Sequence, residues 1–224
     1  MSVLRIARLL AVFAVVGAHA AAPPAPPSDP ALQQALAQYE RGDFATARLA
    51  FERLSHQGIP AADYNLAVMH LRGELAPASI AEAVRLLERA AGRGFVTAMV
   101  GLARLHEHGE IAGTRDLPAA MAWWRRAAEA GSVEAQVEIG TGHFLGRGVA
   151  KDMALAAHWY REAAKRGDVG AMYLIASMYQ HGDGVAPDLR LARYWYAQAA
   201  AQGDVAAPGK LREIDAALAA GGPD

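Results

Sequence analysis

Histidines are the residues of this chain whose spacing first suggests chemistry. His106 and His108 flank Glu107, while His70 and His143 lie 36 residues before and 37 residues after His106. Imidazoles bind zinc at about 2.0–2.1 Å, but helix positions i and i+2 point about 200° apart, so His106 and His108 cannot share one ion. Histidines on successive packed helices lie about 10 Å apart. We therefore predict packing roles and no metal site. An effect of acid pH through His70, His106 and His143 stays a hypothesis.

The sequence lacks the motifs of the common enzyme classes. The 224 residues include no cysteine, which excludes disulfides and a cysteine nucleophile. The serines form neither S-x-x-K nor G-x-S-x-G, and no H-E-x-x-H, P-loop or dinucleotide-binding fingerprint occurs. A formal net charge of −1 gives no basic excess with which to neutralise nucleic-acid phosphates. The sequence therefore predicts a protein that is not an enzyme, requires no cofactor and binds no nucleic acid.

The elements that would position any site come from an internal repeat. Two series of glycines recur every 36 or 37 residues, and three aspartates return in the same register. The positions are Gly58, Gly94, Gly131, Gly167 and Gly203; Gly73, Gly109, Gly146 and Gly182; and Asp116, Asp152 and Asp188. A period of this length is typical of stacked helix–turn–helix units. The additional residue of the second full unit falls between Gly109 and Asp116, where we expect a loop.

Each unit has the pattern of two helices joined by a loop. Apolar residues recur at helical spacing in the first helix, as at Leu102 and Leu105, and the following glycine ends that helix in the left-handed conformation. The second helices can be capped by Ser79, Asp152 and Asp188. They also carry aromatic and small residues that we expect to pack between neighbouring repeats. These are Trp123, Trp159 and Trp195, and the alanine pairs Ala90–Ala91, Ala127–Ala128, Ala163–Ala164 and Ala199–Ala200.

The segment AMYLIASMYQHGDGVAPDLRLARYWYAQAAAQG, residues 171–203, carries the combined pattern most completely. It resembles the Sel-one-like repeat, a relative of the tetratricopeptide repeat, and the resemblance covers about residues 60–203 in four units. It implies an all-α fold, a right-handed α-solenoid of helix–turn–helix repeats with a C-terminal capping helix. Leu75 and Ile111 stand where the family has a second loop glycine, so we expect the first two loops to take a different path.

The N-terminal residues have the pattern of a signal peptide. Arg5 and Arg8 precede the apolar run Leu9–Val16, and Ala18-His19-Ala20 offers the small residues of a cleavage site. The apolar run is far shorter than the ~20 residues that span a bilayer. We therefore favour cleavage after Ala20 over a retained membrane anchor, and expect a periplasmic or secreted protein with no stable membrane anchor after cleavage.

The remaining divisions follow the repeat. Residues before the first Sel-one-like unit resemble an ordinary tetratricopeptide repeat with a shorter loop, a likeness carried by Tyr39, Ala47 and Phe51. The predicted segments are a signal peptide (1–20), a Pro-rich linker (21–30), a tetratricopeptide-like repeat (31–58), repeats 1 to 4 (59–94, 95–131, 132–167 and 168–203), and a capping helix and tail (204–224).

The resemblance implies a scaffold that binds a protein or peptide on a concave face lined by the first helix of each unit. The side chains that register places there mix apolar and hydrogen-bonding groups, as peptide grooves require. We expect Phe144 and Tyr173 to anchor a partner and Arg104 to meet an acidic group. The predicted binding residues are Tyr64, Val68, Leu71, Arg72, Arg104, His108, Thr141, Phe144, Leu145, Tyr173, Ser177 and His181. The alternative is the β-lactamase-like or peptidoglycan-associated activity described for some secreted relatives. The sequence indicates neither the partner nor the oligomeric state.

Overall fold

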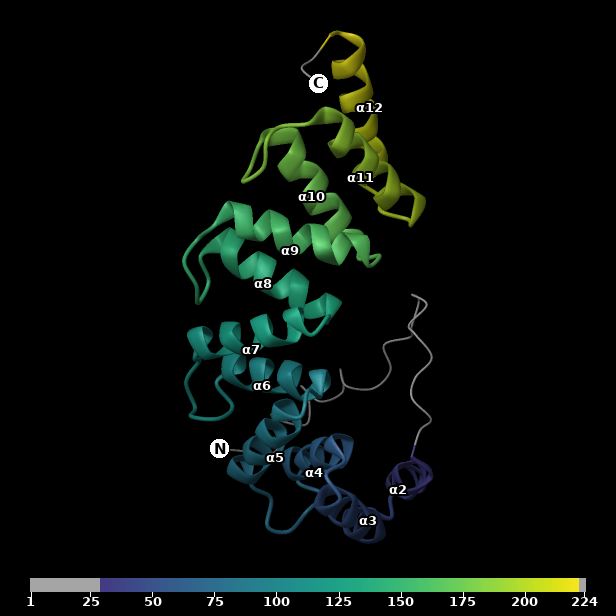
Figure 1. Cartoon of the computed structure of the whole chain (residues 1–224), viewed down its shortest axis with the longest axis vertical. Coiled ribbons are helices and arrows are strands. Elements are labelled where there is room, and N and C mark those ends of the chain that lie inside the picture. The colour runs from purple at the N-terminus through teal and green to yellow at the C-terminus, as the bar shows by residue number, and fades with distance from the viewer. Residues whose placement is uncertain (1–28, 222–224) are drawn as a thin grey trace. The chain divides into compact units, whose positions relative to one another are not determined.

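The computed structural model describes residues 29–221, and every regular element within that range is an α-helix. Figure 1 shows the order of the helices along the chain. Their bounds are α2 Pro30–Glu40, α3 Phe44–His56, α4 Pro60–Arg72, α5 Ile80–Gly92, α6 Val96–His108, α7 Leu117–Glu129, α8 Val133–Leu145, α9 Met153–Lys165, α10 Val169–His181, α11 Leu189–Ala201 and α12 Ala207–Ala219. The predicted all-α helical-repeat fold is confirmed.

The predicted signal peptide (1–20) lies outside the described residues, and so does most of the predicted linker. At the start of the described chain, the Asp29 carboxylate accepts a hydrogen bond from the backbone N–H of Ala31 at 2.9 Å, and α2 begins at Pro30. Proline is favoured in the first helical turn because its fixed φ suits the helix and its missing N–H needs no partner there. No helix among the described residues is long and apolar enough to cross a membrane.

The predicted helix caps are confirmed. Backbone N–H groups in the first turns of α5, α9 and α11 donate to Ser79 at 3.1 Å, to Asp152 at 2.9 Å and to Asp188 at 2.8 Å. The glycines that end the first helices are left-handed, with φ of 71° at Gly73 and 77° at Gly182. A side chain at such a φ is strained, which explains why glycine recurs at this position of each unit.

The chain divides into two compact units, Met1–Asp116 with α2–α6 and Leu117–Asp224 with α7–α12. In the first unit, α4 packs against α3 and α5, and α5 also packs against α6. In the second unit, α9 packs against α8 and α10, while α11 packs against α10 and α12. The second helices α5 and α9 therefore each lie between the first helix of their own repeat and that of the next, which is how stacked repeats share one core.

In each of the last three repeats, the most deeply buried aromatic side chain of the second helix lies one position after the tryptophan expected between repeats. Trp124, Tyr160 and Tyr196 are 1%, 2% and 0% exposed, whereas Trp123 and Trp159 are only partly buried. Successive helical residues point about 100° apart, so one step along the helix separates the core from its margin. The prediction that Trp123 and Trp159 fill the space between repeats is therefore wrong in register.

The small residues predicted between repeats are buried. Every alanine of the four pairs lies in the core except Ala200, which is partly buried. Trp195 is also buried. Small side chains on these helices let neighbouring helices approach closely, so the alanine prediction is confirmed for this position of the repeat.

Two loops of the second unit require glycine. Gly148 in the α8–α9 loop has a φ of 71°, and Gly184 in the α10–α11 loop has a φ of 72°. A Cβ at Gly148 would lie 2.6 Å from the carbonyl oxygen of Leu117, and a Cβ at Gly184 would lie 2.2 Å from the carbonyl carbon of Met153. Each loop therefore lies directly against the start of the preceding second helix, where only glycine leaves room.

The loops of the first unit are built differently, as the sequence predicted. The α4–α5 loop, with Leu75 in place of glycine, contains a cis peptide bond between Ala76 and Pro77. The α6–α7 loop holds the additional residue and places Gly113 at a φ of 74°. The α6–α7 loop thus places its second left-handed glycine two positions after Ile111, where the family pattern has it, and its backbone path differs accordingly.

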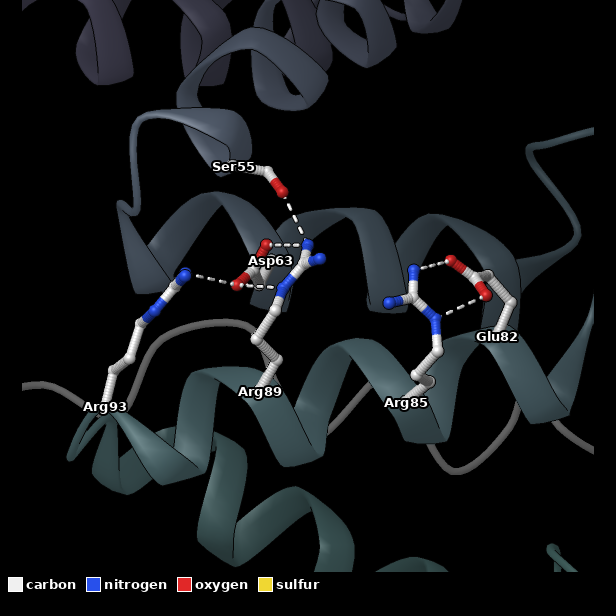
Figure 2. Close-up of polar contacts among 6 residues, drawn as sticks. All are labelled: Ser55, Asp63, Glu82, Arg85, Arg89 and Arg93. Carbon is white, nitrogen blue, oxygen red and sulfur yellow. Dashed lines mark hydrogen bonds and ion pairs between the residues drawn. The ribbon is translucent and has the colours of Figure 1, made fainter.

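A buried carboxylate joins three helices of the first unit, as Figure 2 shows. Asp63 on α4 is 0% exposed. Its carboxylate accepts hydrogen bonds from Arg89 on α5 and from Arg93 just after α5, with N–O distances of 2.8 Å and 3.0 Å to Oδ2. Arg89 also donates to Ser55 Oγ on α3 at 2.5 Å. A buried charge is tolerated when it is paired and hydrogen-bonded, so this network ties α3, α4 and α5 together.

Candidate partner-binding faces

Three predicted binding residues of the first unit gather around one hydroxyl. Tyr64 on α4 is partly buried, and its ring lies 5.5 Å from that of Phe95 between centroids. Burial raises the pKa of Tyr64 to about 12, and the guanidinium groups of Arg72 on α4 and Arg104 on α6 oppose that rise. The two arginines therefore lie close enough to the Tyr64 hydroxyl to act on it electrostatically. The Tyr64 phenol on α4 thus lies in the electrostatic field of two cationic groups, one on α4 and one on α6.

His108, the remaining predicted residue of α6, is exposed at the end of that helix. Its Nδ1 lies 2.7 Å from the carbonyl oxygen of Arg104, one helical turn earlier. The ring is therefore oriented by its own helix, and only its other nitrogen is directed away from that contact.

Tyr39 on α2 belongs to the same face, although it was not among the predicted binding residues. Its hydroxyl accepts a hydrogen bond from Arg72 Nη1 at 2.7 Å and donates one to Glu74 Oε1 at 3.1 Å. Burial, followed by the charge of Glu74, raises the pKa of Tyr39, so the phenol stays neutral. The sequence marked Tyr39 only as part of the tetratricopeptide likeness. Tyr39 stands three residues before Gly42, as His70 stands three residues before Gly73, so it follows the histidine series and not the register from which the binding residues were chosen.

Two of the predicted binding residues belong to the core. Val68 and Leu71 on α4 are 8% and 5% exposed. Their side chains are occupied by packing within the first unit, so they present little surface to a partner. We chose Val68 and Leu71 from the alignment of the repeats, which does not distinguish the buried face of α4 from its exposed face.

In the second unit the predicted residues lie on α8 and α10. Phe144 and Tyr173 are partly buried and pack against the core cluster formed by α9, α10, α11 and α12. Leu145 is 62% exposed. An aromatic ring that packs on the core with one side and is exposed on the other can contribute a large contact area to a partner at low entropic cost. These three side chains form the apolar part of the face.

Hydroxyl and amide groups line the same face. Thr141 Oγ1 on α8 lies 3.0 Å from the hydroxyl of Tyr160 on α9, and the Tyr196 hydroxyl on α11 donates to Gln180 Oε1 on α10 at 3.2 Å. Burial raises the pKa of both Tyr160 and Tyr196, so both phenols stay protonated at neutral pH. The buried tyrosines of the second helices thus deliver hydroxyl groups to the first-helix face. Sequence reasoning missed them because it considered first-helix residues alone.

The Tyr173 ring meets that of Tyr196 edge-on, with centroids 5.1 Å apart and planes inclined by 71°. Ser177 and His181 follow on α10, and His181 Nδ1 lies 2.8 Å from the carbonyl oxygen of Ser177. Ser177 is partly buried and His181 is exposed. The face on α10 therefore runs from a supported aromatic ring to polar groups at the end of the helix.

The histidine series has packing contacts. His143 is 4% exposed, and its Nδ1 lies 3.2 Å from the carbonyl oxygen of Ala150. His70 and His106 are partly buried. Within residues 29–221, no group of three or more His, Cys, Asp or Glu side chains is arranged to hold a metal ion.

The repeat geometry has a match among known protein families. The Sel1 repeat matches four consecutive segments of the chain, residues 60–95, 96–132, 133–168 and 169–204. The chain belongs to the Sel1 repeat family. Sel1 repeat proteins generally mediate protein–protein interactions, and their fold is typically a non-catalytic scaffold. Comparison with curated proteins finds no match.

Solved Sel1 structures share this architecture. A Sel1 repeat protein from Oxalobacter formigenes is 32% identical over 75% of this chain and 49% of its own, with a TM-score of 0.66. A protective antigen present in uropathogenic Escherichia coli strains is 26% identical over 96% of this chain and 44% of its own, with a TM-score of 0.69. The present chain thus spans about half the length of these solved Sel1 repeat proteins.

Proposed function

We propose that this Sel1 repeat chain is an exported interaction scaffold that binds a protein or peptide segment on the first-helix face of its second unit. The observation that carries the proposal is the exposed Leu145 beside Phe144, on a face that continues to Tyr173. Exposed apolar side chains next to aromatic rings that pack on the core are typical of interaction hot spots.

The polar groups of this face suit a polypeptide ligand. Thr141 and Tyr160 form one hydroxyl pair, and Gln180 and Tyr196 form a hydroxyl–amide pair. Such groups can donate to or accept from backbone amides, while the apolar side chains provide affinity. A peptide lying across α8 and α10 would meet both kinds of group in turn.

The face of the first unit favours an acidic partner segment. Arg72 and Arg104 act on the Tyr64 hydroxyl, and guanidinium groups recognise carboxylates through paired hydrogen bonds. Tyr39 holds Arg72 at 2.7 Å and thereby restricts its orientation. We expect this face to accept a carboxylate, with Arg104 in the role proposed from the sequence.

Export to the bacterial envelope is the part of the proposal that depends on sequence alone. The basic start, the apolar run Leu9–Val16 and the small residues up to Ala20 support cleavage by a signal peptidase. N-terminal sequencing of the protein from its native cells should return Ala21. A mature protein that starts at residue 1 or 2 in exported, membrane-bound material would contradict this.

The binding proposal is tested by affinity once cross-linking in native cells has identified a partner. The double variant Phe144→Ala/Tyr173→Ala should lose more than about 2 kcal/mol of binding free energy. The matched control is Leu155→Ala/Leu191→Ala, which truncates exposed leucines of the second helices α9 and α11 and should bind as the unmodified chain does. Circular dichroism must show the same helix content for all three proteins. Equal affinities would move the binding site to another face.

A further inference from the structure

A cavity of about 610 Å³ opens on the loop side of the first unit, and none of the predicted binding residues lines it. It lies between α3 and the α4–α5 loop, and Phe44, Glu52, His70, Glu74, Pro77 and Glu82 are among its lining residues. An adjoining hollow of about 210 Å³ shares Glu52, His70 and Glu82. Cavities that hold ligands typically measure about 300–1,000 Å³, so this one is large enough for a side chain together with the backbone that carries it.

Two of the three carboxylates in the lining form ion pairs with arginines of the chain. Glu52 pairs with Arg48 at 2.6 Å, and both oxygens of Glu82 accept hydrogen bonds from Arg85, at 2.5 Å and 2.9 Å. Figure 2 shows the second pair on α5. These arginines neutralise the acidic side chains that they contact, so neither pair by itself demands a ligand.

Glu74 and His70 are different. Glu74 Oε1 accepts a hydrogen bond from the Tyr39 hydroxyl, but its Oε2 is shielded from solvent and has no hydrogen-bond partner among the described residues. The Nδ1 atom of His70, in the last turn of α4, is likewise shielded and unpartnered. Both residues line the cavity. A buried polar atom without a partner costs free energy, and these two atoms can both accept a hydrogen when the histidine carries its proton on Nε2.

We propose that this cavity binds the guanidinium group of an arginine side chain from a protein partner. A guanidinium carries five N–H donors in a plane and no acceptor, so it can satisfy Glu74 Oε2 and His70 Nδ1 together and introduces no group that needs a donor. Its fixed positive charge complements Glu74, whose carboxylate accepts a hydrogen bond from the neutral Tyr39 hydroxyl, and its planar fork suits carboxylate oxygens.

The remaining lining fits the rest of an arginine residue. Phe44, Leu75 and Pro77 supply apolar surface, on which the methylene stem of a long cationic side chain can lie. The cavity exceeds what a guanidinium alone would fill, which favours a side chain presented by a polypeptide over a small free cation. Glu74 is linked to the first-helix face through the Tyr39 hydroxyl, but the proposal does not depend on that face binding a partner.

The test uses the unmodified chain and two capped amino acids, Nα-acetyl-arginine amide and Nα-acetyl-citrulline amide, in amide-detected NMR titrations. Citrulline has nearly the shape of arginine but is uncharged. The arginine compound should shift the signals of residues around His70, Glu74 and Glu82, and the citrulline compound should bind at least about tenfold more weakly. Equal binding of the two compounds, or shifts elsewhere in the chain, would overturn the proposal. Methylguanidine at the same concentration distinguishes the sources, because binding as tight as that of the arginine compound would assign the cavity to a small free cation.

Variants locate the contact. Glu74→Gln and His70→Gln should each weaken binding of the arginine compound about three- to tenfold. The control is Glu88→Gln, which removes the same charge from an exposed position of α5 and should leave binding unchanged. A loss with Glu88→Gln equal to that with Glu74→Gln would show a general charge effect and contradict a specific site.

Discussion

Arg89 on α5 donates two hydrogen bonds to Asp63 on α4, a carboxylate that is completely buried. The equivalent positions of the other three repeats are also buried but uncharged, and are occupied by Met99, Gln136 and Met172. The first repeat has therefore placed an ion pair where its neighbours place apolar or neutral side chains. The pair joins the N-terminal helices to the first Sel1 repeat through Ser55 on α3.

We expect Arg89→Met to destabilise the first unit by about 3 kcal/mol, because it leaves the buried Asp63 carboxylate with only Arg93. The double variant Asp63→Met/Arg89→Met should recover most of that loss, since methionine already fills the position in two other repeats. Urea unfolding followed by hydrogen exchange in α3–α5 measures both. A double variant less stable than Arg89→Met would show that the ion pair is essential to the fold.

Adjacent tryptophans on α7 should respond differently to truncation. Trp124 is 1% exposed, so Trp124→Ala should cost about 3–5 kcal/mol through lost burial and a cavity. Trp123 is partly buried, and the Cζ atom of Arg126 lies over its ring, 4.3 Å from the ring centroid. Trp123→Ala should therefore cost clearly less. Denaturant unfolding of the two variants compares them directly, and equal losses would contradict the core register.

The loop glycines offer a matched pair. Gly167 and Gly184 both have positive φ, but a Cβ at Gly167 meets nothing within 4 Å, whereas one at Gly184 would meet the backbone of Met153. Gly167→Ala should cost about 1–2 kcal/mol for the backbone conformation alone. Gly184→Ala should cost more because the loop must also move. If thermal unfolding shows the two variants to be equally stable, the close approach of loop and α9 is not tight in solution.

Glu74 should make stability depend on pH. Burial raises its pKa above the usual value of 4.5, so the folded state holds this proton more tightly than the unfolded state. The contribution of protonated Glu74 to the free energy of unfolding is complete below pH 4.5, and it is lost as the pH rises through the pKa that Glu74 has in the folded state. Glu74→Gln should therefore gain stability relative to the unmodified chain between pH 4 and pH 7. Chemical denaturation at both values measures the difference, and a gain that shrinks as pH rises would contradict the shift.

Local chemistry made much of the fold predictable. The repeat length, the helix pairs and the caps at Ser79, Asp152 and Asp188 each follow from residues close together in the sequence. The left-handed glycines follow in the same way, because a single backbone conformation selects the residue. Register also predicted side chains that a partner could reach on α8 and α10, since Leu145 is exposed and Phe144 and Tyr173 are partly buried. Binding at this face stays a prediction.

Features that depend on distant contacts were not predictable. The burial of Asp63 requires Arg89, 26 residues later, to arrive from the next helix. The choice between Trp123 and Trp124 as the core residue depends on a rotation of α7 that neighbouring helices decide. Tyr160 and Tyr196 reach the candidate face from second helices, which a pattern confined to first helices cannot show.

The most direct measurement of the central claim is site-specific photo-cross-linking in native cells. A photoreactive p-benzoylphenylalanine is placed in the substitution Leu145→p-benzoylphenylalanine on α8 and, as the matched control, in Leu155→p-benzoylphenylalanine on α9, both at exposed leucines. If the first-helix face of the second unit binds a partner, position 145 gives a defined protein adduct and position 155 gives none. An adduct at position 155 with none at position 145 would contradict the account and move the partner to the second helices.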